Sequence, residues 1–487
     1  MSYISAIAAL ATAASLTIAP DSIKKQPPIP AVVNLTHNIP KMMRQAEIPG
    51  LAIALLRNGH TDWVHDFGTV NPATNQPVTD RTRFSIASLS KTVFSYVVLQ
   101  LAEQGKIDLD TPLSHYWPER IVDPANDPQL DKITARIVLN HSTGFPDWRT
   151  KGGPLRIYFT PGSRFSYSGE GYVYLQHTVE HIEGKPLSEI AQELVFTPLG
   201  MKDSTYISGP GPEVTDGHDP AGRPIPPHTN KGNAAYSLLT TAHDYAFFLE
   251  AILNQHGMKP DSFLDMEKAQ IAVDPSCTYC TDRAPVKLST SLFWGLGWGI
   301  EQTASGKYLW HWGDNYGYKA FVAVNLNTRD AVVYFANSEN GLAIGPELVR
   351  EAIGGDHPAF PWLGYDTLGS PGLHFTEEVV RHGAGALETC RKDLIGNGIS
   401  QQTIDTASRF LRDAKRFSDA IAIVKRYAEL HSQSPDAWQS LGEAYEAAGQ
   451  RESAAQSYKM ALKVDPASEE ARIALARLGS GPEAISQ

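Results

Sequence analysis

The stretch FSIASLSKTVFSYVVLQL, residues 84–101, places a hydroxyl at Ser88 and an amine at Lys91, three positions apart. If a helix begins at Ser88, Lys91 lies one turn further on the same face, with its amine near the hydroxyl. A serine hydroxyl is a poor nucleophile until a base takes its proton, and a desolvated lysine has the lowered pKa that this task needs. A helix N-terminus also favours negative charge beside Ser88. The pair therefore permits nucleophilic catalysis.

The spacing alone is weak evidence, because two common residues recur three positions apart by chance. Ser22 and Lys25 repeat the pattern near the start of the chain. The case for Ser88 therefore depends on the elements around it and on partner residues elsewhere.

Length and composition bound the class of protein. A chain of 487 residues exceeds the size at which one hydrophobic core stops growing, so two or more domains are expected. With 42% hydrophobic and 20% charged residues, the chain is typical of globular proteins. The formal net charge of -11, without a basic run, argues against nucleic-acid binding.

The three cysteines predict no metal centre. Cys277 and Cys280 form CTYC, but no second pair or nearby histidine completes a zinc set. A local disulfide or two free thiols therefore fits better than a metal, and the two alternatives stay open. Cys390 stands alone.

The first 20 residues are an Ala-rich apolar run that is similar to the hydrophobic region of a signal peptide, although no Lys or Arg precedes it. We expect a leader and spacer over residues 1–35. This pattern favours export to the periplasm or the medium and leaves the cytoplasm open. No other segment is typical of a membrane span.

The middle of the chain predicts helices, and its two ends predict strands. Asn58-Gly59 suits the tight turn of a hairpin between two apolar runs. Closely spaced late strands imply antiparallel pairing, so the sheet joins strands from both ends of this region and the helices pack on it, an α+β arrangement. The expected helices span 87–104, 187–196 and 241–255, the late strands span 295–301, 307–313, 319–326 and 331–338, and a Pro- and Gly-rich loop spans 208–232.

The C-terminal part has a different character. Residues 434–468 place apolar and small side chains at the positions of a 34-residue tetratricopeptide repeat, with a degenerate copy one period upstream. We expect an all-α repeat domain over 396–481, after a linker over 366–395. The motif residues account for helix packing, so the repeats are expected to bind a partner protein or self-associate and not to take part in the chemistry. These residues are Trp438, Leu441, Gly442, Tyr445, Ala454, Tyr458, Ala461 and Pro466, and in the upstream copy Ala407, Leu411, Ala420 and Val424.

From about residue 40 to 355 the chain resembles the serine β-lactamase and penicillin-binding protein superfamily, in the class C-like branch with family VIII carboxylesterases and D-aminopeptidases. FSIASLSKT is similar to its nucleophile box. The blocks GKIDLDTPLSHYWP, ITARIVLNHSTGFP, TPGSRFSYSGEGYVYL, FTPLGMKDSTY and FWGLGWGIE follow in family order. The resemblance implies a hydrolase domain over 36–365, an antiparallel sheet flanked by helices with a helical subdomain, in which Ser88 is the nucleophile beside Lys91.

The resemblance implies further catalytic residues. Tyr167 takes the place of the family's Tyr-x-Asn tyrosine, which as a phenolate acts as a general base, with Lys91 supplying the charge that lowers its pKa. His311, Trp312 and Gly313 form the variant H-x-G of the third family box. Glycine there lets the strand approach the substrate, and the N–H of Asp314 would join the N–H of Ser88 as an oxyanion hole.

Two departures from the family weaken β-lactam recognition. Gly169 replaces the asparagine of Tyr-x-Asn, and His311 replaces a lysine that meets a carboxylate. A histidine with a pKa about 6.5 is mostly neutral at neutral pH. Aromatic residues near the third box either line an apolar cleft or fill the core, and periodicity does not choose between these roles. They are Trp298, Trp310, Trp312, Tyr316 and Tyr318.

These observations together indicate a serine hydrolase that works through an acyl-enzyme, without a metal or cofactor. We expect a carboxylesterase for small esters. A D-amino-acid peptidase or amidase and a β-lactamase are the alternatives within the class, and a non-catalytic penicillin-binding-like sensor or scaffold is the alternative outside it. The natural substrate, the partner of the repeats and the oligomeric state are left open by the sequence.

Overall fold

A computed structural model describes residues 30–149, 153–281, 283–396 and 398–479. The expected leader lies almost wholly outside the described residues, as do Ser22 and Lys25. No helix in the described ranges combines the length and apolar character needed to cross a membrane.

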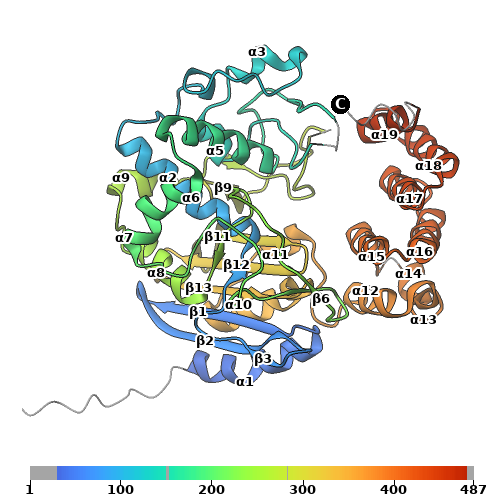
Figure 1. The fold of residues 1–487 in the computed structure, drawn as a ribbon, viewed down its shortest axis with the longest axis horizontal. Coiled ribbons are helices and arrows are strands. Elements are labelled where there is room, and N and C mark those ends of the chain that lie inside the picture. Colours follow the sequence, from blue (N-terminus) through green and yellow to red (C-terminus); the bar gives the residue numbers. More distant parts are fainter. Residues whose placement is uncertain (1–29, 150–152, 282, 397, 480–487) are drawn as a thin grey trace, which may run out of the picture.

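Within the described residues, nine strands form one antiparallel sheet (Figure 1). The first hairpin turns at Asn58 and Gly59, both with positive φ, as expected of this dipeptide. The N-terminal strand pairs with the last one, Leu51 opposite Ala336, which confirms that the sheet joins the two ends of this region. In spatial order the strands are β3 (Gln76–Pro77), β2 (His60–Asn71), β1 (Gly50–Arg57), β13 (Asp330–Ala336), β12 (Tyr318–Asn325), β11 (Gly306–Asn315), β10 (Gly299–Thr303), β9 (Leu292–Trp294) and β8 (Ile271–Ala272).

Helices cover both faces of this sheet because its central strands are apolar on both sides. Along β1, Leu51 and Ile53 face a core shared with α1 (Pro30–Gln45) and α10 (Gly345–Ile353), with α11 (Ala359–Leu363) beside them. The alternate residues of β1 face α2 (Ser90–Glu103) and α8 (Ala242–Leu253) on the other side. The result is a three-layer domain with the start of α2 buried against the sheet.

A helical subdomain extends the second face. Its main helix, α5 (Gly169–Glu183), begins at an N-cap serine, Ser168, whose hydroxyl accepts from the N–H of Gly171 at 3.0 Å. Two short pairs, β4 (Phe84–Ser85) with β7 (Leu239–Thr240) and β5 (Gly217–His218) with β6 (Pro224–Ile225), lie in the connecting loops. The remaining elements of this domain are η1 (Ala87–Leu89), η2 (Leu113–His115), η3 (Pro124–Asn126), α3 (Asp127–Leu130), α4 (Ala135–Leu139), α6 (Leu187–Ala191), the π-turn η4 (Gln192–Phe196), α7 (Thr197–Leu199), α9 (Pro260–Met266) and η5 (Gly341–Ile344).

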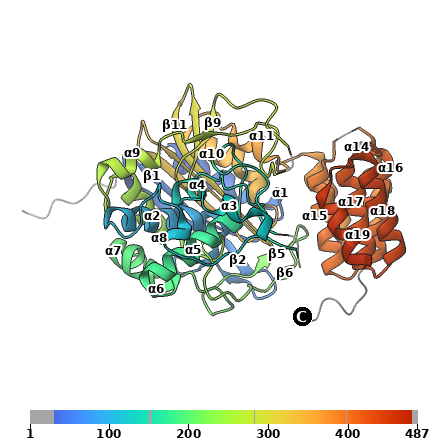
Figure 2. The ribbon, with the colours of Figure 1, turned by 90° about the horizontal axis from the view of Figure 1, so that it is seen from above.

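The C-terminal helices stack beside the hydrolase domain as a separate layer (Figure 2). Successive pairs are α15 (Gln401–Asp413) with α16 (Phe417–Leu430) and α17 (Pro435–Ala447) with α18 (Arg451–Val464), closed by α19 (Glu469–Gly479). Residues of the expected degenerate copy, among them Ala407, Leu411 and Val424, are fully buried between the helices. The α+β fold with an all-α repeat region is therefore confirmed.

The expected linker over residues 366–395 is instead helical. It forms α12 (Pro371–His382), η6 (Gly383–Gly385), α13 (Ala386–Thr389) and α14 (Arg391–Ile395). Phe375 and Val379 of α12 lie in the same core as the repeats, because α12 packs against α15. Ser370 caps α12 and Pro371 follows at its first position, a start signal that predicts this helix. The expectation of a linker was wrong.

Gly442 tests the packing of the repeats. A Cβ at this helical position would lie 2.3 Å from the ring of Tyr458. We expect Gly442→Ala to lower the free energy of unfolding by roughly 1–3 kcal/mol, although alanine normally stabilises a helix relative to glycine. Urea unfolding followed by circular dichroism measures the change. Gly385→Ala is the matched control, because no atom lies within 4 Å of its Cβ; equal stability of the two variants would contradict the assigned contact.

Candidate active site

Ser88 lies in η1, at the point where α2 meets the sheet. The preceding residue, Ala87, has φ +50, a conformation that costs a non-glycine residue roughly 1–2 kcal/mol. The Ala87 carbonyl accepts a hydrogen bond from the hydroxyl of Ser90 at 2.5 Å, which helps to hold this turn. The turn leaves the Ser88 side chain partly exposed while Ala87 and Leu89 are buried. Ser88 is therefore fixed and accessible.

Lys91 meets Ser88 as its spacing predicts. Its Nζ donates to Ser88 Oγ at 3.1 Å and to the carbonyl of Ala235 at 2.8 Å. The side chain is buried, and loss of solvation lowers the Lys91 pKa to about 7, while the carboxylate of Asp147 acts in the opposite direction. Near neutral pH a large fraction of Lys91 is thus an uncharged amine that can accept the Ser88 proton.

Tyr167 lies beside the pair but differs from the expected phenolate. Its ring centre is 4.9 Å from Lys91 Nζ. Burial and the Asp147 carboxylate raise the Tyr167 pKa well above 10, and the nearby Ser88 hydroxyl offsets only part of this rise. The Tyr167 hydroxyl is buried and makes no hydrogen bond of ordinary geometry with a described residue. Tyr167 is therefore a neutral phenol in this structure, and Lys91 is the better placed base.

His311 lies behind the site. It is fully buried in β11, and its Nδ1 is 2.8 Å from the carbonyl of Trp312, so Nδ1 carries the proton. Burial and the charge of Lys91 lower the His311 pKa to about 3. Its Nε2 is buried without a hydrogen-bond partner among the described residues. His311 thus stays neutral over the whole working range of pH, more firmly than its ordinary pKa predicts.

Gly313 lets β11 approach the nucleophile turn. A Cβ at Gly313 would lie 2.4 Å from the carbonyl oxygen of Ile86 and 3.2 Å from the Cβ of Ala87. Only glycine fits this contact without moving the turn. Asp314 follows it and borders the same cavity as Ser88. The oxyanion hole formed by the two N–H groups stays a prediction.

A steric contact explains why position 169 is a glycine. A Cβ there would lie 2.6 Å from the indole ring of Trp148, which stands over the start of α5. The N–H of Gly169 donates to the carboxylate of Asp147 at 2.8 Å. An aromatic side chain therefore covers position 169, where the resemblance places an asparagine.

A cavity of about 320 Å³ opens above Ser88. Among its described lining residues, Ser88, Tyr167, Trp312 and Asp314 were expected and His311 does not appear, while Lys91 lies beneath Ser88. Residues that the sequence reasoning missed complete the wall; four come from loops, one from the end of β11 and one from α15, and none belongs to a motif of its own. They are Asp147, Trp148, Tyr236, Tyr279, Asn315 and Arg409.

Arg409 is notable because it belongs to α15, the first repeat helix. Its Nη2 is 2.7 Å from Glu339 Oε1, and its guanidinium carbon is 5.2 Å from the ring centre of Tyr316. Tyr316 in turn stacks on Phe410 with ring centres 4.6 Å apart. Aromatic and ionic contacts thus dock α15 at the rim of the cavity, and the expectation that the repeats take no part in the chemistry stays a prediction.

The positions of the aromatic and sulfur residues show which roles they take. Trp298, Trp310 and Trp312 are buried in the two cores, and Trp312 also lines the cavity. Tyr316 and Tyr318 line a smaller neighbouring cavity. Cys277 and Cys280 form a disulfide that positions the loop carrying Tyr279. The described residues include no cluster of three or more His, Cys, Asp or Glu side chains suited to a metal ion.

Comparison with known proteins places this geometry in context. Residues 35–352, more than half of the chain, match the family described as beta-lactamase, and residues 435–478 match a tetratricopeptide repeat. A beta-lactamase of Pseudomonas fluorescens is 27% identical over 273 residues, 53% of this chain and 71% of that protein. Esterase EstB of Burkholderia gladioli is 25% identical over 349 residues, 58% of this chain and 84% of that protein.

The fold is similar to that of solved structures. A structure of D-alanine carboxypeptidase AmpC from Burkholderia cenocepacia has a TM-score of 0.53 and 19% identity, covering 66% of this chain and 98% of the other. This likeness concerns the fold alone.

The burial of Lys91 predicts the pH dependence of the reaction. With the neutral amine acting as the base that our hypothesis requires, kcat/KM for nitrophenyl acetate should rise with pH and level off above about 7. Asp147 raises the Lys91 pKa, so Asp147→Asn should shift the rise in kcat/KM to lower pH. Asp62→Asn, an exposed change on β2, is the control and should not move it. If the Asp147→Asn variant shows no rise of kcat/KM with pH, the rise in the parent protein reports ionisation of Asp147, whose own pKa is raised to about 6.

Proposed function

Because the chain belongs to the beta-lactamase family, a superfamily of serine hydrolases, we propose that it is a carboxylesterase that hydrolyses small esters through an acyl-enzyme. The observation that carries the proposal is the contact between Lys91 and the partly exposed Ser88. A non-catalytic sensor would have no need of a buried amine held at hydrogen-bond distance from a nucleophile in an open cavity.

The reaction follows from the positions of these groups. Ser88 Oγ attacks the ester carbonyl carbon and its proton passes to Lys91 Nζ. The N–H groups of Ser88 and Asp314 would stabilise the negative oxygen of the intermediate. The carbon–oxygen bond to the alcohol then breaks, and Lys91 returns the proton to the leaving oxygen. Water adds to the acyl-enzyme by the same path and releases the acid.

Two features of the cavity favour an ester over a β-lactam. Trp148 covers Gly169, where an asparagine amide would otherwise meet the substrate, and His311 is neutral and outside the cavity wall. The cation of Arg409 is already shared with Glu339. Ester cleavage also depends less on proton donation to the leaving group, because an alcohol leaves more readily than an amine.

Asp147 supports a second candidate, an amidase for substrates with a free amino group. Its carboxylate borders the cavity and, among the described residues, accepts a hydrogen bond from the Gly169 N–H alone. A substrate ammonium would find a countercharge there.

Ser88→Ala tests the nucleophile. We expect covalent labelling by a fluorophosphonate to vanish and ester turnover to fall at least about a thousandfold, because the substitution removes the attacking oxygen and leaves the rest of the side chain in place. Mass spectrometry of the labelled protein and circular dichroism measure labelling and folding. Ser305→Ala, an exposed serine in a turn, is the matched control. Labelling of a folded Ser88→Ala protein would refute the assignment.

The preference between substrates has its own test. In the parent protein kcat/KM should be higher for a nitrophenyl ester than for a chromogenic cephalosporin, since one missing charge-assisted contact costs roughly tenfold to more than a hundredfold. The double variant Trp148→Ala/Gly169→Asn places an asparagine amide at position 169 and should narrow the difference in kcat/KM between the two substrates. The single variant Trp148→Ala is its control. A parent protein that prefers the cephalosporin would make it a β-lactamase.

A further inference from the structure

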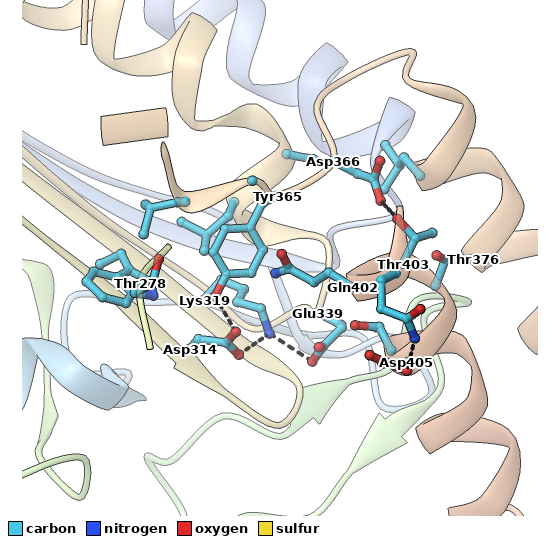
Figure 3. A pocket seen from close by; sticks show the side chains of 18 of the residues that line it. Thr278, Asp314, Lys319, Glu339, Tyr365, Asp366, Thr376, Gln402, Thr403 and Asp405 are labelled. Atoms are coloured by element: carbon cyan, nitrogen blue, oxygen red, sulfur yellow. Dashed lines mark hydrogen bonds and ion pairs between the residues drawn. The ribbon is translucent and has the colours of Figure 1, made fainter. Parts of the chain in front are cut away.

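A chamber of about 680 Å³ lies between the hydrolase domain and the repeats (Figure 3). Its size falls within the range of sites that bind small molecules, roughly 300–1,000 Å³. One wall comes from the sheet and the segment after α11, and the other from α15. Neither domain alone encloses it.

The chamber adjoins the catalytic cavity. Tyr279, Trp312, Asp314 and Arg409 border both spaces. A substrate whose carbonyl lies at Ser88 would pass between these residues to reach the chamber. The catalytic cavity also adjoins a smaller space of about 270 Å³ through Tyr236 and Asn315. Each of the two arms of an ester thus has a neighbouring space of its own.

Lys319 and Arg409 beside the chamber are paired with carboxylates, and Asp366 and Asp405 accept hydrogen bonds from neutral hydroxyls. Lys319 Nζ is 2.8 Å from Asp314 and 2.9 Å from Glu339, and Tyr365 donates to Asp314 at 2.5 Å. On the other wall, Thr403 donates to Asp366 at 2.8 Å and Ser440 donates to Asp405 at 2.6 Å. An anionic ligand would have to displace one of the ion pairs, whereas an uncharged ligand would not.

The two walls differ in chemistry. The hydrolase wall combines an apolar patch of Leu342, Ala343 and Leu363 with the ion pairs just described. The repeat wall presents amide and hydroxyl groups, and Gln402 is exposed on it with its amide directed toward Tyr365 (Figure 3). An amide group both donates and accepts hydrogen bonds without carrying charge. A purely alkyl chain would leave the polar wall without partners.

We propose that this chamber is a substrate subsite, and that it binds an uncharged, amide-bearing arm of the substrate along α15. The first repeat helix is then part of the substrate-binding surface of the hydrolase. The inference rests on the proposed function in one respect only, that Ser88 is the reactive centre.

Fluorophosphonates that label Ser88 test the subsite without requiring turnover of an ester. One pair of probes carries, on the phosphorus-bound carbon, either an arm with two secondary amides or an alkyl arm of the same length. A second pair carries the same arms on the retained alkoxy oxygen, so that both directions out of the catalytic cavity are sampled. In one of the pairs we expect the amide arm to label about tenfold faster, the effect of one or two net hydrogen bonds.

Two variants locate the effect. Gln402→Trp fills the chamber from the repeat wall and should abolish the advantage of the amide arm over the alkyl arm. Gln456→Trp, the same change at an exposed glutamine of α18 away from the chamber, should keep that advantage. Equal labelling by amide and alkyl arms in both pairs, or an advantage that survives Gln402→Trp, would overturn the proposal. Absence of labelling by every probe would refute the assignment of Ser88 and with it the subsite, whereas labelling with arm preference but without ester turnover would refute only the carboxylesterase.

Discussion

The removal of the Lys91 amine from water is the interaction on which the site depends. A lysine charge is costly to bury, and the three-layer fold buries this one against the sheet at the start of α2. The Ala235 carbonyl and the Ser88 hydroxyl are the acceptors that compensate it. Tyr167 and His311 are buried beside it, and loss of their own solvation keeps both neutral, with the Asp147 carboxylate adding to the effect at Tyr167 and the Lys91 charge at His311. Desolvation thus sets the protonation of all three groups.

Backbone geometry around the pair is arranged for access. Ala87 is held in a left-handed conformation, and Gly313 allows β11 to lie directly against it. Glycine at 169 makes room for an indole ring, which takes the place of a polar side chain at the cavity wall. The shape of the cavity is therefore determined by the Ala87 turn and by two close approaches at glycines as much as by the side chains that line it.

The sequence predicted the parts of this structure that have a local signal. The Asn58-Gly59 hairpin, the late strands and the helix after Ser88 follow from turn chemistry and periodicity, and the Ser88–Lys91 contact follows from helical spacing. The expected phenolate at Tyr167 does not agree with its raised pKa, because the sequence reports neither the burial of the phenol nor the nearby Asp147 carboxylate. Arg409 was missed because its role depends on how two domains dock, and no motif in α15 encodes that contact. Helix α12 had a readable start signal at Ser370 and Pro371 that was overlooked.

Docking of the repeats through Glu339, Tyr316 and Arg409 also limits how such a chain can be rearranged by recombination. A crossover between the sheet and α15 would join a hydrolase carrying Glu339 and Tyr316 to repeats selected against another surface. The carboxylate of Glu339 is almost fully buried. After such an exchange it would still pair with Lys319 but would lose its ion pair with the Arg409 guanidinium. Exchange of the two modules is thus coupled to a small set of interface residues, and the repeats would be inherited together with the enzyme rather than shuffled as an independent adaptor.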